Sequence, residues 1–309
     1  MWWLVTGLLR SVLDGLLVGS VYALMAIGLT LVYRVTQVAN FAHAEYITYG
    51  AYASYIAMAW FGGDLVTAAV AGMLAGAALS LASDETVFKP LWKRGATPLH
   101  LLVASIGVGL ILRYGLLAVA ASTVGLLKIR LPTFPEAIGH ILGVVPINII
   151  HILSPGTALV VTVFLHLLFT RTKLGKAMRA MASNPVLARI SGINIFLVRR
   201  VTWILGGMLA GLSGFIFAYY TQANPESGWI ALLWIFAAAI MGGFTFYGTI
   251  ISGVILGVVG QVAIFLAAQL AGVSTAYTPV VALLVTVVVL LFKPEGVIRL
   301  QSLALKKRV

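Results

Sequence analysis

The densest polar cluster of this apolar chain is Asn40-Phe-Ala-His-Ala-Glu45, which carries a histidine and a carboxylate two residues apart. Ionisable groups are costly inside an apolar segment, so each of them is a candidate for function. Residues two apart do not share a helix face, so His43 and Glu45 are not expected to grip one solute together. We hypothesise that Asn40, His43 and Glu45 line a path or gate between helices.

A structural interpretation of the same cluster stays open. Asn40 is a good N-cap residue, which would place His43 at the third helical position and Glu45 in the first turns. A carboxylate near the start of a helix also complements the helix macrodipole. Capping and local hydrogen bonding would then explain the cluster without any contact to a solute.

Other charged residues also lie within or beside apolar segments. Arg113 either lines the same path or extends along its helix until the guanidinium reaches the membrane surface. Asp14 is expected to pair with Arg10, one helical turn earlier. We expect Asp84-Glu85 and Lys93-Arg94 to face each other as a solvated pair in a loop.

The chain lacks the sequence features of common metal and nucleotide sites. His43-x-Glu45 does not have the spacing of His-Glu-x-x-His zinc enzymes, and Gly175-Lys176 is followed by Ala177 where a phosphate-binding loop needs Ser or Thr. The chain has no cysteine, which excludes disulfides and thiolate ligands. We therefore expect no metal site, no cofactor and no catalysis on this chain.

The composition is that of a membrane protein. Hydrophobic residues make up 61% of the 309 residues and charged residues only 9%, whereas soluble domains carry roughly a quarter charged residues. The formal net charge of +12 does not indicate nucleic-acid binding, because the basic residues flank apolar segments. Cytoplasmic anchoring and contact with anionic lipid explain them.

Nine apolar segments approach or reach the length of a membrane span. They lie near Leu8–Tyr33, Phe41–Trp60, Asp64–Ala82, Thr97–Ala120, Ile152–Thr170, Val201–Tyr220, Trp229–Gly242, Gly248–Leu270 and Ala276–Phe292. The seventh is short, so eight crossings and one re-entrant segment are an alternative. Barrel-type alternation is absent, and the predicted fold is all-α: a polytopic integral membrane bundle of eight to nine segments. Met1-Trp2-Trp3 is interpreted as part of the first span, not as a signal peptide.

The basic residues indicate the orientation. With the amino terminus outside and the carboxyl terminus in the cytoplasm, sixteen of the 20 Lys and Arg residues fall on the cytoplasmic side. Short loops rich in Lys and Arg stay in the cytoplasm. The side of the amino terminus depends on the number of spans, since one more or one fewer would reverse it.

Glycines predict how the helices pack. Small residues four apart lie on one helix face and let two backbones approach closely. Four such pairs occur in separate apolar segments: Gly15/Gly19, Gly72/Gly76, Gly207/Gly211 and Gly253/Gly257. They favour a tightly packed bundle or a subunit interface and do not reveal a function.

The run Arg171–Arg200 holds seven basic residues and no acidic one, and it is predicted to be a cytoplasmic loop of two short helices. An apolar stripe follows the helical period at Leu174, Ala177, Met178 and Met181. Asn184-Pro185 should end this helix and start another, which Gly192 terminates. The helix pair either inserts into a groove on a partner protein or lies on the inner leaflet of the membrane.

A family resemblance rests on several of these segments. Arg179-Ala-Met-Ala-Ser-Asn-Pro-Val-Leu-Ala-Arg-Ile-Ser-Gly-Ile-Asn194 is similar to the coupling-helix region of ABC-importer permeases for branched-chain amino acids. Asn40–Glu45 resembles that family's Asn-Phe-Ala-His-Gly-Glu signature, with Ala44 in place of glycine. Ser105–Leu112 and Lys293–Val297 follow in the expected order, so the resemblance covers about residues 10–300. The segment Met241–Gly248 departs from the family, because aromatic residues replace small ones there.

The resemblance implies a permease subunit that forms the translocation path for hydrophobic, branched-chain amino acids in the plasma (cytoplasmic) membrane of a prokaryote. Its partners would be a second permease (a paralogue or another copy), two ATP-binding cassette subunits that carry ATP and Mg, and an extracytoplasmic solute-binding protein. Residues 1–309 would form a single permease domain, with 171–200 as its coupling loop. The resemblance assigns to this loop Lys176, Arg179, Ala180, Asn184, Pro185, Arg189, Gly192 and Asn194.

Other functions stay open from the sequence. Urea, amides or other small polar solutes are alternative cargoes. A stand-alone secondary transporter would carry carboxylates for coupling ions and inverted repeats, and we find no convincing repeat and few acidic residues at span centres. A membrane-embedded enzyme would need a paired carboxylate or a Ser/His constellation, for which Asn40–Glu45 is the one dense polar cluster.

Overall fold

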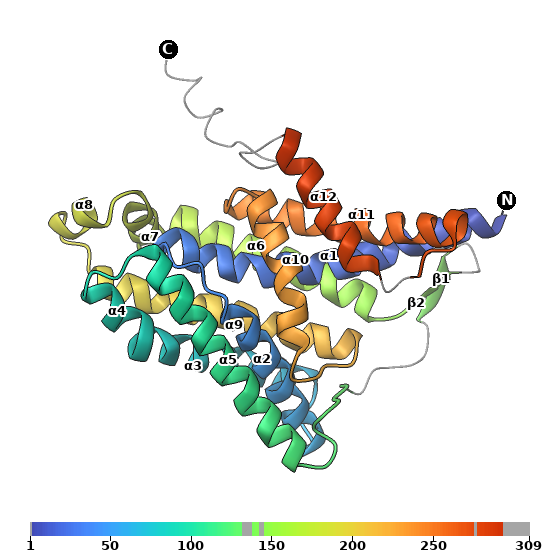
Figure 1. The fold of residues 1–309 in the computed structure, drawn as a ribbon, viewed down its shortest axis with the longest axis horizontal. Helices are drawn as coiled ribbons and strands as arrows, with labels where there is room; N and C mark the ends of the chain where they lie inside the picture. The colour runs from blue at the N-terminus through green and yellow to red at the C-terminus, as the bar shows by residue number, and fades with distance from the viewer. Residues whose placement is uncertain (1, 132–137, 142–144, 275–276, 293–309) are drawn as a thin grey trace. The chain divides into compact units, whose positions relative to one another are not determined.

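The structure is a computed structural model that describes residues 2–131, 138–141, 145–274 and 277–292, and it is mostly helical (Figure 1). The helices are α1 (Trp2–Thr36), α2 (His43–Ala59), α3 (Leu65–Ser83), the π-helix η1 (Asp84–Phe88), α4 (Lys89–Lys93), α5 (Pro98–Ser122), α6 (Ile150–Arg171), α7 (Lys173–Ser183), α8 (Pro185–Ile190), α9 (Ile195–Tyr220), α10 (Ser227–Met241), α11 (Phe246–Ala271) and α12 (Thr278–Phe292).

Each of the nine predicted spans coincides with a helix of the structure. In the part of the chain that is described, six helical segments are long and apolar enough to cross a membrane. They are Leu4–Thr36, Leu65–Lys93, Pro98–Ser122, Ile150–Arg171, Ile195–Tyr220 and Phe246–Ala271. The helices α2, α10 and α12 have only 17, 15 and 15 residues, which is short for a full crossing of the hydrocarbon core.

The prediction of an all-α fold misses one small feature. Strands β1 (Gly139–Ile141) and β2 (Val145–Ile147) form an antiparallel hairpin in which Gly139 pairs with Ile147. Each strand has three residues, which is too few for alternation of polar and apolar side chains to stand out in a sequence.

The chain forms two compact units, each assembled from segments that are distant in sequence. The first contains residues 1–30, 134–156 and 233–309, and the second contains residues 31–133 and 157–232. Three helices, α1, α6 and α10, contribute residues to both units.

Close backbone contact between α1 and α11 organises the first unit. A Cβ added to Gly15 would lie 2.6 Å from the Cα of Val258, and one added to Gly257 would lie 2.2 Å from the Cα of Gly19. Further along the same helices, the hydroxyls of Thr30 and Thr249 hydrogen-bond at 2.9 Å. Two predicted glycine pairs, Gly15/Gly19 and Gly253/Gly257, therefore meet at this crossing.

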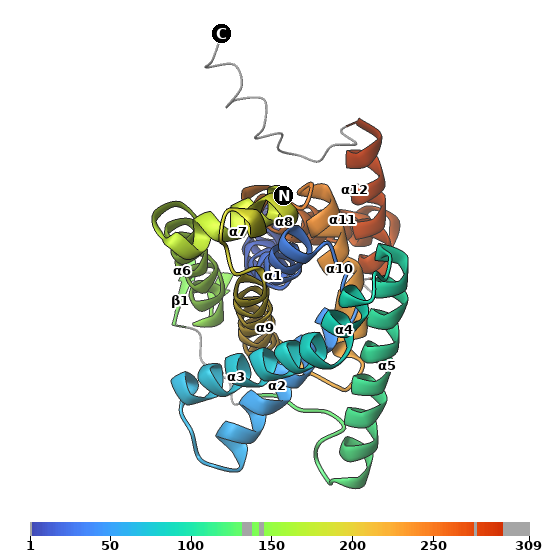
Figure 2. The same cartoon turned by 90° about the vertical axis from the view of Figure 1, so that its left-hand side faces the viewer.

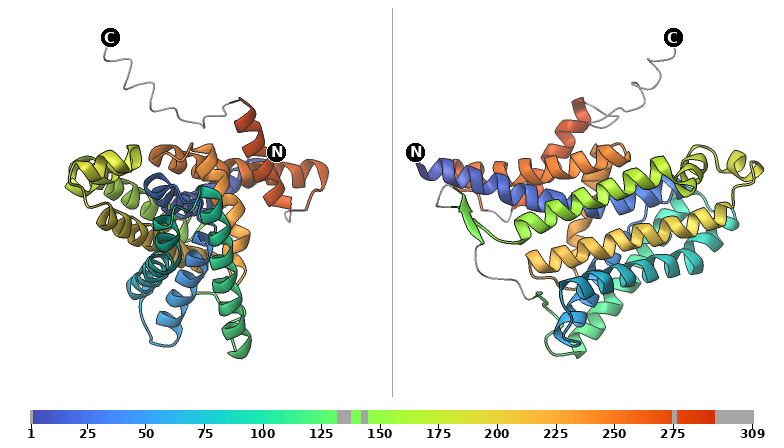
Figure 3. Two further views of the ribbon diagram at one scale, coloured as in Figure 1. Left: turned by 60° about the vertical axis from the view of Figure 1, so that its left-hand side comes forward. Right: turned by 180° about the vertical axis from the view of Figure 1, so that it is seen from behind.

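The second unit is organised by α2, α3 and α9, which lie next to one another (Figures 2 and 3). The other two glycine pairs meet here: a Cβ on Gly211 would lie 1.9 Å from the carbonyl oxygen of Gly72, and one on Gly76 would lie 2.2 Å from that of Gly207. Gly50 of α2 completes the crossing, because its Cβ would lie 2.4 Å from the Cα of Gly211.

We expect Gly211→Ala to destabilise the protein, because even one methyl group would overlap backbone atoms on α3. Overpacking of this kind costs about 1–3 kcal/mol, which thermal unfolding in detergent would detect as a lower midpoint. Gly107→Ala in α5 is the matched control, since no atom lies within 4 Å of its added Cβ. An equal loss of stability in both variants would contradict this account of the crossing.

Candidate functional site

The backbone between α1 and α2 is irregular and buried. It begins at Gln37, whose φ of 57° is in the left-handed region, and continues through Val38 and Asn40, both 0% exposed. Such backbone must find hydrogen-bond partners inside the protein when no water is present. Ser105 of α5 supplies partners: its hydroxyl accepts a hydrogen bond from the N–H of Phe41 (3.0 Å), and its single hydrogen is shared between the carbonyls of Leu102 (2.7 Å) and Ala39 (3.2 Å).

The expectation that Asn40 caps α2 is wrong. The helix begins at His43, its N-cap is Ala42, and no side chain makes a capping hydrogen bond there. The Asn40 carbonyl accepts the His43 N–H at 3.3 Å, whereas its side chain interacts with the hydroxyl of Tyr46. Phe41 and Ala42 lie between Asn40 and the first residue of the helix, so the Asn40 side chain is out of capping range.

His43 and Glu45 are both buried in the first turn of α2, with 0% and 1% of their surface exposed. The ring of His43 packs edge-to-face on Tyr46, with 6.1 Å between ring centroids. The Oε2 atom of Glu45 accepts no hydrogen bond from any described residue. The structure therefore brings Asn40, His43 and Glu45 into one buried segment and leaves Oε2 of Glu45 without a described partner there.

Arg113 makes an ion pair, which neither sequence interpretation predicted. Its Nη2 donates to Oε1 of Glu226 at 2.9 Å, and its side chain is 13% exposed. The guanidinium also lies over the rings of Trp229 and Tyr114, at 5.1 and 5.5 Å from their centroids. Arg113 interacts electrostatically with Glu45 as well, so it is the cation shared by two carboxylates.

The beginning of α10 packs on the first turns of α2. The Gly228 N–H donates to the hydroxyl of Thr48 at 2.9 Å, and a Cβ on Gly228 would lie 2.1 Å from the Ala44 carbonyl oxygen. Glu226 is two residues before Gly228, so the same close approach holds the partner of Arg113 near α2. Three elements, α2, α5 and the start of α10, thus position this candidate site.

A buried ion pair between Asp84 and Arg199 was missed by the sequence analysis. The Arg199 Nε donates to both carboxylate oxygens of Asp84, at 2.9 and 3.0 Å, and the side chains are 2% and 0% exposed. The guanidinium lies over the rings of Trp92 and Trp203, at 5.5 and 5.9 Å from their centroids. The pair joins η1 to the second turn of α9.

The neighbouring charges form a second, more exposed layer. Glu85 pairs with Lys89 and with Arg200, so the expectation that Asp84-Glu85 faces Lys93-Arg94 in solvent is wrong. The signal that could have found both pairs is the match between two adjacent acidic residues and two adjacent basic ones, Arg199-Arg200. Because α9 begins at Ile195, these arginines lie in the first turns of the helix that contains the predicted span Val201–Tyr220.

The two short helices between α6 and α9 are confirmed. Asn184 is the N-cap of α8, where its Oδ1 accepts the N–H groups of Val186 and Leu187 at 3.0 Å. Gly192 follows α8 with a φ of 81°, and Asn194 caps α9 through the N–H of Leu197 at 3.1 Å.

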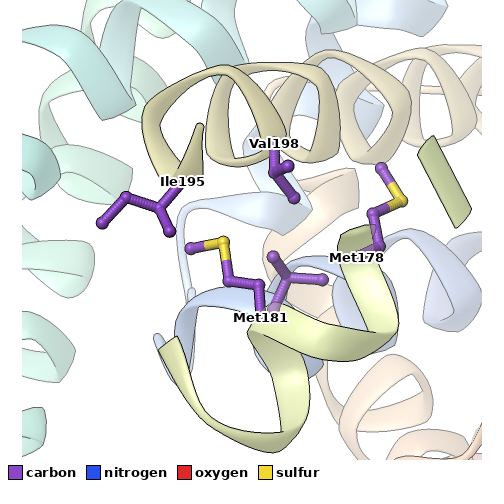
Figure 4. Packing of buried hydrophobic residues seen from close by; sticks show 5 residues of the cluster. Met178, Met181, Ile195 and Val198 are labelled. Carbon is purple, nitrogen blue, oxygen red and sulfur yellow. The ribbon is translucent and has the colours of Figure 1, made fainter. Parts of the chain in front are cut away.

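The apolar stripe of α7 packs against the chain itself. Met178 and Met181 are 1% and 4% exposed and pack in one cluster with Ile195, Val198 and Val35. Figure 4 shows the two methionines of α7 facing Ile195 and Val198 of α9. Neither a partner groove nor a lipid surface is needed to cover the stripe. Arg179 turns back as well and donates to the carbonyl of Phe169.

Helix α8 exposes its apolar residues. Val186, Leu187 and Ile190 are 65%, 60% and 77% exposed, and Arg189 beside them is also exposed. Asn184 and Gly192 fix both ends of this six-residue helix. We call Val186, Leu187 and Ile190 the α8 patch.

These features define a class of protein: a multi-pass helical membrane protein with buried polar groups at helix breaks. The sequence matches the family described as branched-chain amino acid transport system / permease component over residues 11–290. The chain belongs to this family.

Curated relatives agree with the family. The chain is 31% identical to the high-affinity branched-chain amino acid transport system permease protein BraD of Pseudomonas aeruginosa over 94% of this chain and 95% of that protein. It is also 31% identical to the "Probable branched-chain amino acid transport permease protein LivH" of Methanocaldococcus jannaschii, over 93% of this chain and 92% of that protein. A shorter match, 32% over 109 residues, links it to the galactose/methyl galactoside import permease protein MglC of Escherichia coli. No solved structure matches significantly.

We predict that Ser105→Ala destabilises the protein by about 1–3 kcal/mol, because the buried N–H of Phe41 loses its acceptor. Thermal unfolding in detergent measures this change. Ser122→Ala is the control, since the Ser122 hydroxyl donates to Val119 in an exposed part of the same helix. Equal midpoints for Ser105→Ala and the wild type would show that Ser105 does not hold the break.

Asp84→Asn is expected to cost roughly 3–5 kcal/mol of stability, because it leaves the charge of Arg199 buried without compensation. Glu85→Gln removes the adjacent carboxylate, whose side chain is 30% exposed, and should cost at most about 1 kcal/mol. The double variant Asp84→Leu with Arg199→Met should be more stable than Asp84→Asn in the same unfolding assay. Similar midpoints for Asp84→Asn and Glu85→Gln would contradict the assigned role of the buried pair.

Proposed function

We propose that this chain is a permease subunit of an ATP-driven importer and forms the translocation path for branched-chain and other hydrophobic amino acids. The observation that carries the proposal is the match to permease components over residues 11–290. The names of the relatives with the longest matches support this class of cargo. The shorter likeness to a galactoside permease keeps other small solutes as an alternative cargo.

We further propose that ATP is hydrolysed on two separate ATP-binding cassette subunits, with a second permease and an extracytoplasmic solute-binding protein completing the importer. The chain has no phosphate-binding loop of its own, which supports this division of labour and a lack of cofactors on this subunit. The second permease is either a paralogue or another copy of this chain.

The proposed topology has the amino terminus outside, the 171–200 loop and the carboxyl terminus in the cytoplasm, and eight to nine membrane segments in the plasma membrane of a prokaryote. The excess of Lys and Arg in the loop supports this orientation. Because α1, α6 and α10 each contribute to both units, we propose that residues 1–309 act as a single permease domain.

We propose that the α8 patch is the surface that receives the ATPase. Its three aliphatic side chains are exposed on a short helix with fixed ends, and exposed apolar groups rimmed by charge are typical of protein interfaces. Arg189 is exposed on the same helix and Lys176 is exposed on α7, whereas Arg179 donates within its own chain. Motion of the patch would reach α9 through Met178 and Met181, which pack on Ile195 and Val198.

The proposed path is lined by Asn40, His43, Glu45 and Arg113, at the point where α2 and the start of α10 approach each other. Discontinuous helices commonly mark solute sites in transporters. Burial of these polar groups beside an irregular backbone supports the assignment.

Ile190→Asp should reduce co-purification of the ATPase subunits and transport at least tenfold, because it places a carboxylate at the centre of an apolar contact. Affinity purification of the complex from membranes measures the first effect, and solute uptake measures the second. Leu99→Asp is the control: Leu99 is 69% exposed and Ile190 77%, and Leu99 lies at the start of α5, where an acidic residue is well tolerated. Unchanged recovery of the ATPase with Ile190→Asp would refute docking at α8.

A further inference from the structure

Glu45 differs from every other acidic residue that the structure describes. Six of the eight acidic residues lie in the described part of the chain. Asp14, Asp84, Glu85 and Glu226 each form an ion pair, and Asp64 caps α3 through the N–H of Thr67 at 2.8 Å. Among these six, Glu45 alone has neither an ion pair within 4.0 Å nor a capping role, although it is 1% exposed.

The charges around Glu45 do not balance. Arg113 interacts electrostatically with Glu45 but forms its hydrogen-bonded ion pair with Glu226. One guanidinium therefore serves two carboxylates, and the more deeply buried carboxylate is the one without a direct partner. An ionised carboxylate in a region of low dielectric is costly unless a cation or a proton compensates its charge, so a cation bound here would stabilise the ionised form of Glu45.

The unpartnered polar atoms are complementary to a zwitterion. Oε2 of Glu45 and Nε of Arg113 are buried without hydrogen-bond partners among the described residues. The carboxylate oxygen of Glu45 accepts hydrogen bonds, which an ammonium group donates. Arg113 Nε donates one, which a carboxylate accepts.

From these observations we infer that Glu45 receives the α-ammonium group of the transported amino acid and that Arg113 receives its carboxylate. This inference rests on the proposed function and adds to it the chemical group that the permease itself recognises. Glu226, whose side chain is 54% exposed, holds Arg113 when the solute is not bound. A metal cation would supply the same charge as the ammonium group, and the experiment separates the two.

The test uses the complete complex of permeases and ATPases in detergent, labelled by a leucine analogue with a diazirine in its side chain. Three competitors are compared: leucine, 4-methylpentanoate, which lacks the ammonium group, and 3-methylbutylamine, which lacks the carboxylate. In the wild type, leucine should compete at least about tenfold better than 4-methylpentanoate, because a charge-assisted hydrogen bond contributes on the order of a tenfold affinity difference or more. Labelled peptides should map to α2, α5 or the start of α10.

Glu45→Gln has nearly the same shape without the charge and should reduce the advantage of leucine over 4-methylpentanoate to less than threefold. Asp64→Asn is the matched control, since it also removes one carboxylate but keeps a good N-cap residue, and it should retain the full advantage. Replacing sodium by N-methylglucamine should leave the labelling unchanged. Full discrimination by Glu45→Gln, or a requirement for sodium, would overturn the inference.

The wild-type comparison decides the question even if Glu45→Gln does not assemble. Equal competition by leucine and 4-methylpentanoate in the wild type overturns the ammonium site. Failure of the proposed function has a different signature, because the reconstituted importer would then take up no branched-chain amino acid. Uptake of leucine together with equal competition would refute the ammonium site and leave the proposed function standing.

Discussion

A polar group buried away from water must find its partner within the protein, and this constraint shapes the second unit. At two places in this unit the buried polar groups have partners. Ser105 satisfies the irregular backbone before α2, and Asp84 neutralises Arg199 between two tryptophan rings. At a third place a partner is missing, because Oε2 of Glu45 is buried without a described partner. An unpartnered buried atom is costly, so a solute that hydrogen-bonds to it would stabilise the unit most at this place.

The closest helix crossings depend on glycine, which has no side chain to separate the backbones. Where Gly211 meets Gly72, and where Gly257 meets Gly19, the backbones of two helices are in direct contact. Close packing replaces the hydrophobic drive that is missing between helices in lipid. A crossing of this kind holds α9 directly against α2 and α3. The π-helix η1 begins at Asp84 and directly follows α3. Such π-helical turns are frequent at functional sites.

The loop between α6 and α9 has one covered and one exposed apolar surface. Helix α7 uses its apolar stripe to attach to α9 through Met178 and Met181, whereas α8 leaves Leu187 and Ile190 exposed. The two helices carry similar apolar patterns, so periodicity alone could not tell which face is covered by the chain. Arg179 illustrates the same limit, because its charge suggests an external partner while its guanidinium donates to Phe169.

The sequence by itself determined the membrane class, the nine helices, the break at Asn184-Pro185 and the glycine faces, because these follow from local hydrophobicity, capping and steric rules. It also drew attention to Asn40–Glu45, because ionisable residues are rare in such a chain. Only the tertiary structure decided which charges meet. Asp84 pairs with Arg199, which is 115 positions away in the sequence, and Arg113 pairs with Glu226, which is 113 positions away. It likewise decided that Asn40 does not cap α2 and that α7 is covered. Contacts between distant segments depend on how helices cross, which local sequence patterns do not specify.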